Sequence, residues 1–382
     1  MADPLAEPPA PAPSDAGNAS LLTGALHVYV AFDWGDEIDL DRARSLVEAG
    51  LRELARRRRT PTSIAYRPPP LFVTLPRVPL ELPEVGAVRA TAGVTLFDFA
   101  AVSTQLTIPF RLPADGLRRL ADALAEPKAL VDAARTALQP LHERLLPAIH
   151  GPLWRSDLSE EYFVFQLPPG PPLPAPAELL HGDERADWLA SLVRLENGPF
   201  SPEEVAEALR LHLAYTPNDL FIPDWAAAVL LDRDCDETLQ AIEFANLQLL
   251  EFRHIDNRLD DSLAAAAHVL HPRTRSWLPF WRTYARPLRL LGELKVEAAG
   301  LFERTNNVLK LVGDQYLARV YRLVATRFHL DTWEQDIQRK LEVAEGAYQV
   351  VSDQASGTRT EFLEVVVVLL ILLEVILAIY HR

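Results

Sequence analysis

The sequence predicts an α+β fold: a cytoplasmic mixed α/β head, then an α-helical, coiled-coil-like stalk and one C-terminal transmembrane helix. Three observations predict it. Strand-like alternation and helical spacing follow each other in the first half of the chain, helical spacing dominates after Asp236, and residues 362–380 are largely apolar. Because the strand patterns have one polar face, they favour an α+β layer over a doubly wound parallel sheet.

Periodicity and capping residues predict the elements of the first domain. Residues 27–32 and 102–110 alternate as strands do, with their apolar side chains on one face. Asp39 can cap a helix from Leu40 to about Arg57. The other expected elements are strands at 71–75 and 161–167, a hairpin over 88–99 that turns near Ala92 and Gly93, and helices at 114–124 and 127–146.

A proline-rich segment, 168–176, has six prolines in nine residues and predicts a semi-rigid linker or surface loop. Helices are expected after it at 183–195 and 201–213, followed by a buried strand at 226–231; Ser201 and Glu204 form a capping box. The predicted organisation is a disordered Pro-rich tail at 1–22, an α+β domain at 23–167, the linker at 168–176, a second mixed region at 177–235, a helical stalk at 236–360 and a membrane anchor at 361–382.

The stalk contains a heptad-like series of apolar residues. They step by four, four, three, four and three residues, which predicts a coiled-coil seam. Its members are Trp333, Ile337, Leu341, Ala344, Tyr348 and Val351. The seam can pack against the helix expected at 236–261 of the same chain or against a second copy, and a polar hinge at 354–360 is expected after it.

The terminal apolar segment predicts a membrane span. As a helix it is ~28 Å long, close to the ~30 Å hydrocarbon core of a bilayer. Its apolar side chains contribute about −5 to −9 kcal/mol, against a cost of about 3 kcal/mol for Glu374. The residues singled out in this anchor are Phe362, Glu364, Glu374 and Tyr380. The alternative is a helix buried in a soluble core or oligomer.

The first residues contain no apolar signal segment, so the sequence predicts a tail-anchored, single-pass membrane protein. The bulk of the chain would then be cytoplasmic and its C-terminus would cross the membrane. Glu374 would either form a hydrogen bond across a helix dimer or be tolerated near the far interface.

Composition excludes some chemistry. The chain has 38 basic and 53 acidic residues, a net charge of −15, which makes direct nucleic-acid binding an unfavourable expectation. Cys235 is the only cysteine, so the chain can form neither an internal disulfide nor a cysteine-based zinc cage. Neighbouring aspartates also disfavour its thiolate.

Residues 262–292 contain no acid and combine arginines with aromatic residues. This composition suits a helical connector, or contact with anionic lipid headgroups, an RNA backbone or an acidic partner. The residues that would make such contact are Arg273, Arg275, Trp277, Trp281, Arg282, Arg286 and Arg289.

Two carboxylate patterns resemble metal sites without completing one. Asp232, Asp234 and Asp236 with Glu243 imitate a calcium loop, but the turn position that requires Gly holds Glu237. Glu251 and His254 form one Glu-x-x-His, whereas a di-iron site needs two such pairs. We therefore predict no metal or cofactor, and no catalytic residue is assigned.

The C-terminal stalk, IQRKLEVAEGAYQVVSDQASGTRT, runs into Leu363-Glu364, an aliphatic run and Glu374. This arrangement resembles the "required for meiotic nuclear division" (Rmd1/YagE-type) membrane-anchored family, as a divergent bacterial variant. The opening LHVYVAFDWGDEIDLDRARSLV is loosely similar as well. The resemblance implies a homo-oligomeric, membrane-tethered organising protein and carries over no catalytic residue.

The predicted function is that of a non-catalytic, tail-anchored scaffold or tether that self-associates through its stalk and presents its head to a protein partner. The lipid bilayer is the other expected partner. The alternative prediction is a membrane-associated, metal-dependent enzyme with a site around Asp232, Asp234, Glu251 and His254.

Overall fold

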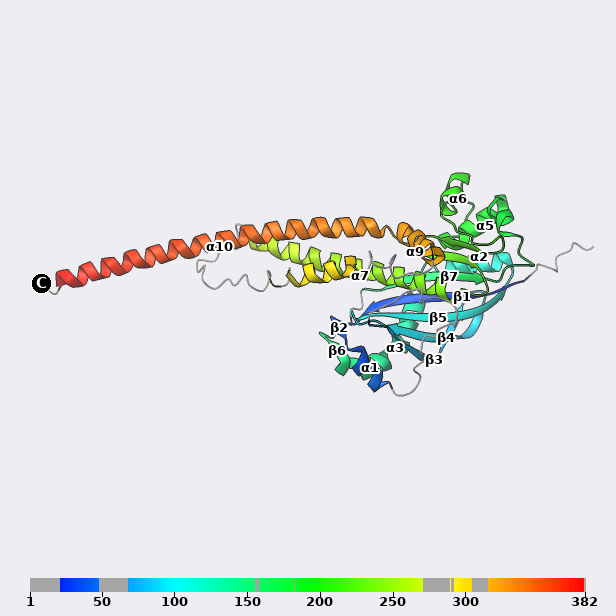
Figure 1. The fold of residues 1–382 in the computed structure, drawn as a ribbon, viewed down its shortest axis with the longest axis horizontal. Helices are drawn as coiled ribbons and strands as arrows, with labels where there is room; N and C mark the ends of the chain where they lie inside the picture. The colour runs from blue at the N-terminus through cyan, green and yellow to red at the C-terminus, as the bar shows by residue number, and fades with distance from the viewer. Residues whose placement is uncertain are drawn as a thin grey trace, which may run out of the picture.

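The computed structural model confirms a mixed α/β fold with one large sheet and many helices (Figure 1). It describes residues 21–47, 68–154, 158–181, 183–270, 289, 292–303 and 315–380. The tail at 1–20 and the helix expected from 48 to 57 lie outside these residues.

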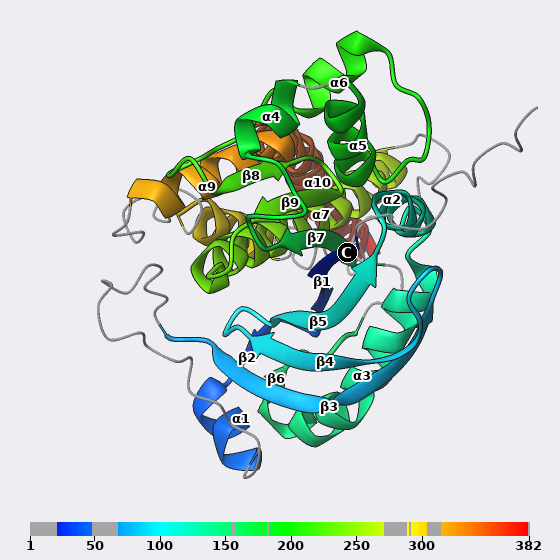
Figure 2. The same ribbon diagram turned by 90° about the vertical axis from the view of Figure 1, so that its right-hand side faces the viewer.

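Seven strands form the main sheet, in the order β3-β4-β5-β1-β7-β9-β8 (Figure 2). They are β1 (Leu22–Asp33), β3 (Leu71–Leu82), β4 (Gly86–Leu96), β5 (Ala101–Leu112), β7 (Glu160–Leu167), β8 (Leu220–Pro223) and β9 (Ala227–Leu231). Every neighbouring pair is antiparallel except β7 and β9. The short strands β2 (Glu37–Ile38) and β6 (Ile149–His150) form a separate pair.

The strand at 27–32 is confirmed and is longer than its pattern suggested. The strand at 102–110 is confirmed as part of β5. The predicted hairpin turn at Ala92 and Gly93 is wrong, because β4 runs through both residues. The turns lie instead between β3 and β4 and between β4 and β5, where Glu84, Gly86 and Ala100 have positive φ.

Helices of the head cover one face of the sheet. They are α1 (Leu40–Leu46), α2 (Ala114–Ala123), α3 (Lys128–Leu145), α4 (Pro176–His181), α5 (Asp183–Arg194) and α6 (Pro202–Ala208). The predicted caps are confirmed, since Asp39 accepts a hydrogen bond from Arg42 N and Ser201 accepts one from Glu204 N. Leu117, Leu138 and Leu189 bring α2, α3 and α5 into the main hydrophobic core.

The proline-rich segment does not interrupt the sheet. β7 precedes it and β9 follows it, yet the two strands pair in parallel. The regions predicted on either side of 168–176 therefore contribute to one sheet.

The opposite face of the sheet is covered by α7 (Asp236–Leu270) and, through it, by α9 (Gln315–Arg327) and α10 (Leu330–Tyr380). Ile337, Leu341 and Ala344 of the predicted seam are buried in the cluster that contains Phe252 and Ile255 of α7. This part of the seam thus packs within the chain. α10 continues beyond the head (Figure 1) and has no break at the hinge predicted for 354–360.

No helix in the part of the chain that the structure describes is long and apolar enough to cross a membrane. The predicted transmembrane anchor at 361–382 and the single-pass, tail-anchored localisation are therefore wrong. The insertion free energy derived from the sequence treated residues 362–380 as a separate helix. It included the cost of only one carboxylate, Glu374. In the structure these residues continue a helix that begins at Leu330, and this helix also carries Glu364.

Candidate functional sites

A cleft at the end of β1 brings titratable side chains together from three parts of the chain. Asp33 is the last residue of β1, Glu251 and His254 lie one turn apart on α7, and Glu297 belongs to the helical residues 292–303. The cavity has a volume of about 180 Å³. Its remaining lining residues are Gly35, Asp36, Phe99, Val296 and Gly300.

Asp33 and His254 form a buried ion pair in this cleft. Their Oδ2 and Nδ1 atoms are 2.6 Å apart, although the ring N–H is not aligned for a regular hydrogen bond. Gly35 N donates to the other carboxylate oxygen of Asp33 over 2.9 Å and so fixes its orientation. The second ring nitrogen of His254, Nε2, is 4.0 Å from Glu297 Oε1, while Glu297 Oε2 binds Arg258 over 2.5 Å.

Charge in the cleft favours the protonated imidazole. Burial on its own lowers the pKa of His254, but Asp33, Glu251 and Glu297 outweigh burial and the pKa is raised. Because a carboxylate holds one ring nitrogen, proton exchange with a ligand is left to Nε2. The cleft can therefore exchange a proton with a small ligand.

The sequence indicated two of the titratable residues that the cleft brings together. Glu251 and His254 were noticed through their helical spacing, but Asp33 and Glu297 belong to no motif. The available signal for Asp33 was strand alternation, which places it on the same face as His27 and Tyr29 and hence toward α7.

The residues of the predicted alternative metal site do not converge. Asp232 and Asp234 precede α7, whereas Glu251 lies fifteen residues into that helix, ~22 Å further along its axis. Glu243, the twelfth residue of the calcium-like pattern, instead faces the sheet near Thr95 and Ser103. Within the described ranges, no group of three or more His, Cys, Asp or Glu is placed to hold a metal ion.

Cys235 is buried just before α7. Burial, reinforced by Asp232 and Asp236, raises the pKa of its thiol to about 12. The expectation of a disfavoured thiolate is confirmed, with burial as the larger cause.

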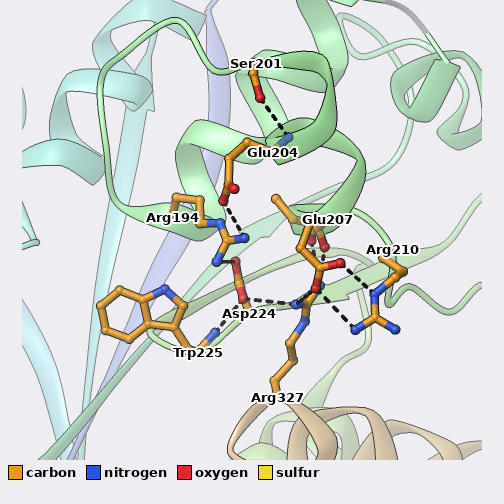
Figure 3. A network of polar contacts seen from close by, with 9 residues as sticks. Arg194, Ser201, Glu204, Glu207, Arg210, Asp224, Trp225 and Arg327 are labelled. Carbon is orange, nitrogen blue, oxygen red and sulfur yellow. Dashed lines mark hydrogen bonds and ion pairs between the residues drawn. The ribbon is translucent and has the colours of Figure 1, made fainter.

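A second polar cluster joins the head to α9 (Figure 3). Asp224 is 1 % exposed and pairs with Arg194 over 3.1 Å and with Arg327 of α9 over 3.6 Å. Arg327 Nη2 also donates to the backbone oxygens of Glu207 and Ala208 over 2.7 and 3.1 Å. These contacts satisfy helix-end carbonyls and a buried carboxylate, so we interpret the cluster as a structural clamp.

Of the basic, aromatic segment 262–292, residues 262–270 end α7 and residues 289 and 292 are helical, while 271–288 and 290–291 lie outside the described residues. Arg289 is exposed and binds Glu293 one turn further on, over 2.9 Å. Arg273, Arg275, Trp277, Trp281, Arg282 and Arg286 therefore stay a prediction. The side chains of Phe362, Glu364 and Tyr380 are outside the description too, while Glu374 is exposed on α10.

Comparison with known proteins places the head in a family. Residues 23–237 match the family model described as "Uncharacterized protein MJ0711, N-terminal domain". The chain belongs to this family. The match begins in β1 and ends in the first turn of α7, so it includes all the strands of the main sheet. Asp33 of the cleft lies inside the family domain, and its partner His254 lies outside.

A curated relative, the uncharacterized protein MJ0711 of Methanocaldococcus jannaschii, is 27% identical over 200 residues. The alignment covers 51% of this chain and 60% of the relative, so the chain spans less than two thirds of that protein's length. No solved structure matches this chain.

The family match overturns the resemblance to the "required for meiotic nuclear division" family. That resemblance rested mainly on the final fifty residues, whereas the match lies in the first two thirds of the chain. Alternating acidic and aliphatic blocks occur in many long helices, because any such helix needs both solvation and an apolar contact face. The terminal pattern was therefore a poor family signature.

Proposed function

We propose that the protein is a non-catalytic scaffold that self-associates through the distal part of α10. The observation that carries the proposal is a group of exposed aliphatic side chains on this helix, each more than half accessible. They are Val367, Val368, Leu370, Ile371, Leu372, Leu373 and Leu377.

These residues surround the helix. Successive residues are turned by ~100°, so Val367, Val368 and Leu373 point in three well-separated directions. A helix that is apolar all round is typical of a buried position. One partner helix covers only one side, so the pattern favours a bundle of several copies.

Another copy of the chain is the partner that fits best. The proximal seam of α10 is already buried against α7 of its own chain, whereas the distal part extends past the head (Figure 1). Every copy presents an identical apolar end at the same distance from its head, which suits a symmetric assembly. Burying each exposed aliphatic side chain contributes about 1 kcal/mol per copy, which together offsets an association cost of about 4–15 kcal/mol.

The test is the mass of the intact chain in solution, measured by light scattering with size-exclusion chromatography. We expect an oligomer for the unmodified protein. Leu370→Glu combined with Leu373→Glu should reduce it to the monomer, because buried unpaired carboxylates oppose association. Val343→Glu is the matched control, since Val343 is 56% exposed on the same helix beside the head.

A monomeric unmodified protein at micromolar concentration would contradict the proposal. So would an oligomer whose mass is the same in the double variant. Loss of the oligomer in the Val343→Glu control would assign association to the head-proximal part of α10 instead.

The alternative of a metal-dependent enzyme around Asp232, Asp234, Glu251 and His254 is not proposed further. Asp232 and Asp234 precede α7, whereas Glu251 and His254 lie well inside this helix. A metal ion requires all its ligands within about 2–2.6 Å of one centre.

A further inference from the structure

An aromatic pocket lies on the face of β1 opposite the Asp33–His254 cleft. Phe32 of β1 and Trp34, the first residue after this strand, flank Asp33 in the chain and pack with α3. His142 comes from α3 and Trp154 follows β6. Trp34 lies 4.8 Å from His142 and 5.6 Å from Trp154 between ring centroids, and His142 and Trp154 are 4.9 Å apart.

A cavity of about 360 Å³ opens beside these rings. Its lining residues include Arg135, Gln139, His142 and Trp154. Small-molecule sites occupy ~300–1,000 Å³ and combine apolar walls with a few polar groups, so this cavity is at the small end of that range.

Three ring nitrogens in this cluster are buried without a hydrogen-bond partner among the described residues: Trp34 Nε1, Trp154 Nε1 and His142 Nε2. Trp34 itself is fully buried. A buried indole N–H normally finds an acceptor, as Trp188 does by donating to the backbone oxygen of Ala114 over 3.0 Å. Three unpaired nitrogens on rings that contact one another indicate a ligand-binding site in this pocket.

Among the described residues, the cavity lining carries one cation, Arg135, which lies beside the rings, and one carboxylate, Glu143. The guanidinium carbon of Arg135 is 5.2 Å from the centroid of Phe32 and 5.8 Å from that of Trp154. The nearest carboxylate on the lining, Glu143, accepts a hydrogen bond from Gln139 over 3.1 Å. Indole N–H groups with a guanidinium select an acceptor that carries negative charge.

We propose that this pocket binds a small carboxylic acid with a planar, apolar body. The carboxylate accepts a hydrogen bond from Trp154 Nε1 beside Arg135, and the planar body packs on the ring of His142. All these residues lie within 23–237, the part matched by the family model, so the site belongs to the head and is independent of association through α10.

The test follows the indole N–H signals of the intact chain by ¹⁵N NMR during titration with benzoate and with indole-3-acetate. Each tryptophan contributes one such signal, and single Trp→Phe variants assign them. We expect both acids to shift the Trp34 and Trp154 signals, and benzyl alcohol and benzylamine, which lack the carboxylate, to bind at least about tenfold more weakly.

Trp154→Phe removes one N–H donor and keeps an aromatic ring. Because Trp154 is only partly buried, this variant should still fold. Trp34→Phe changes a fully buried side chain and would also disturb the core. We expect it to weaken benzoate binding by about tenfold or more. Trp225→Phe is the matched control, since Trp225 is 59% exposed and outside the pocket, and it should bind benzoate like the unmodified chain.

Three outcomes would overturn the proposal. In the first, neither acid at several millimolar shifts the Trp34 or Trp154 signal. In the second, benzyl alcohol and benzylamine bind as tightly as the acids. In the third, Trp154→Phe binds benzoate as tightly as the unmodified chain. The first outcome would show that these rings only pack in the core.

Discussion

Consecutive residues at the end of β1 and just after it face opposite sides of the main sheet. Asp33 is turned toward α7 and pairs with His254, whereas Phe32 and Trp34 are turned toward α3 and the aromatic cluster. A one-residue shift of β1 against β5 would exchange these environments and bury Asp33 among aromatic rings. The long, regular pairing of Leu22–Asp33 with Ala101–Leu112 opposes such a shift.

The Asp33–His254 pair predicts a pH-dependent contribution to stability. The folded-state pKa of His254 is raised, so the contribution is complete below the ordinary histidine pKa of about 6.5 and is lost as pH rises through the folded value. Asp33→Asn should lower the pKa of His254 and reduce the free energy of unfolding at pH 6 by about 1–3 kcal/mol. Both are measurable, by NMR titration and by urea unfolding.

Asparagine keeps the Oδ1 acceptor for Gly35 N, so the change removes charge with little loss of local structure. The control Glu126→Gln alters an exposed carboxyl far from the cleft. An unchanged titration of His254 in Asp33→Asn would show that the pair does not set its pKa.

Glu243 also predicts a stability that falls as pH rises, because burial disfavours its charged form. Its side chain is partly exposed as a whole, but Oε1 is buried and lacks an aligned hydrogen bond among the described residues. Burial raises its pKa from 4.5 to about 7, and the hydroxyls of Ser103 and Thr95 offset only part of this. Stability should therefore fall as pH rises from 4.5 to about 7.

Glu243→Gln should remove this loss and stabilise the protein at pH 8 by up to about 3 kcal/mol, with little difference near pH 4.5. Urea unfolding at both pH values measures it, and Glu342→Gln on exposed α10 is the control. A variant that is less stable than the unmodified chain at pH 8 would show that ionised Glu243 has a stabilising partner.

At the scale of elements, α9 and the head depend on each other through Arg327. This residue ends α9 and is the arginine that reaches across to α6 and Asp224 (Figure 3). Its backbone acceptors, Glu207 O and Ala208 O, are at the C-terminal end of α6, where a cation is favoured by the helix dipole.

Arg327→Gln should lower the free energy of unfolding by about 2–4 kcal/mol, because it leaves buried Asp224 with one cation and two carbonyls without a donor. Arg327→Lys should lower the free energy of unfolding by less, since it keeps the positive charge and loses only the planar guanidinium group. Arg322→Gln, on the exposed side of α9, is the control. Equal stability of Arg327→Gln and the control in urea unfolding would contradict the clamp.

At the scale of the molecule, α10 divides into two parts with different partners. Its proximal residues are buried against α7, and its distal aliphatic residues are exposed. The first part fixes the direction of the helix from the head, and the second carries the proposed self-association. The Leu370→Glu and Leu373→Glu experiment should therefore change the mass of the assembly and leave the unfolding of the head unchanged, because neither residue is in the core clusters of the head.

Local patterns predicted much of the secondary structure. Alternation in 102–110, the caps at Asp39 and Ser201, and the helical spacing in 236–261 each depend on residues close in the chain, and each is confirmed. The turn at Ala92 was predicted wrongly, because small residues permit a turn without requiring one. The apolar end of the chain was assigned to a membrane, because hydrophobicity requires burial without naming the medium that provides it.

The sequence by itself determined many of the strands and helices, which of their faces are apolar, and that the chain has no cysteine pair to cross-link. Only the tertiary structure decided that β7 and β9 share a sheet across the proline-rich segment, that Asp33 meets His254, and that three ring nitrogens remain buried together. The physical reason is sequence separation. The β7–β9 pairing, the Asp33–His254 pair and the contacts of Trp34 with the other two rings each join residues more than fifty positions apart. Side-chain periodicity carries no information about partners at that distance.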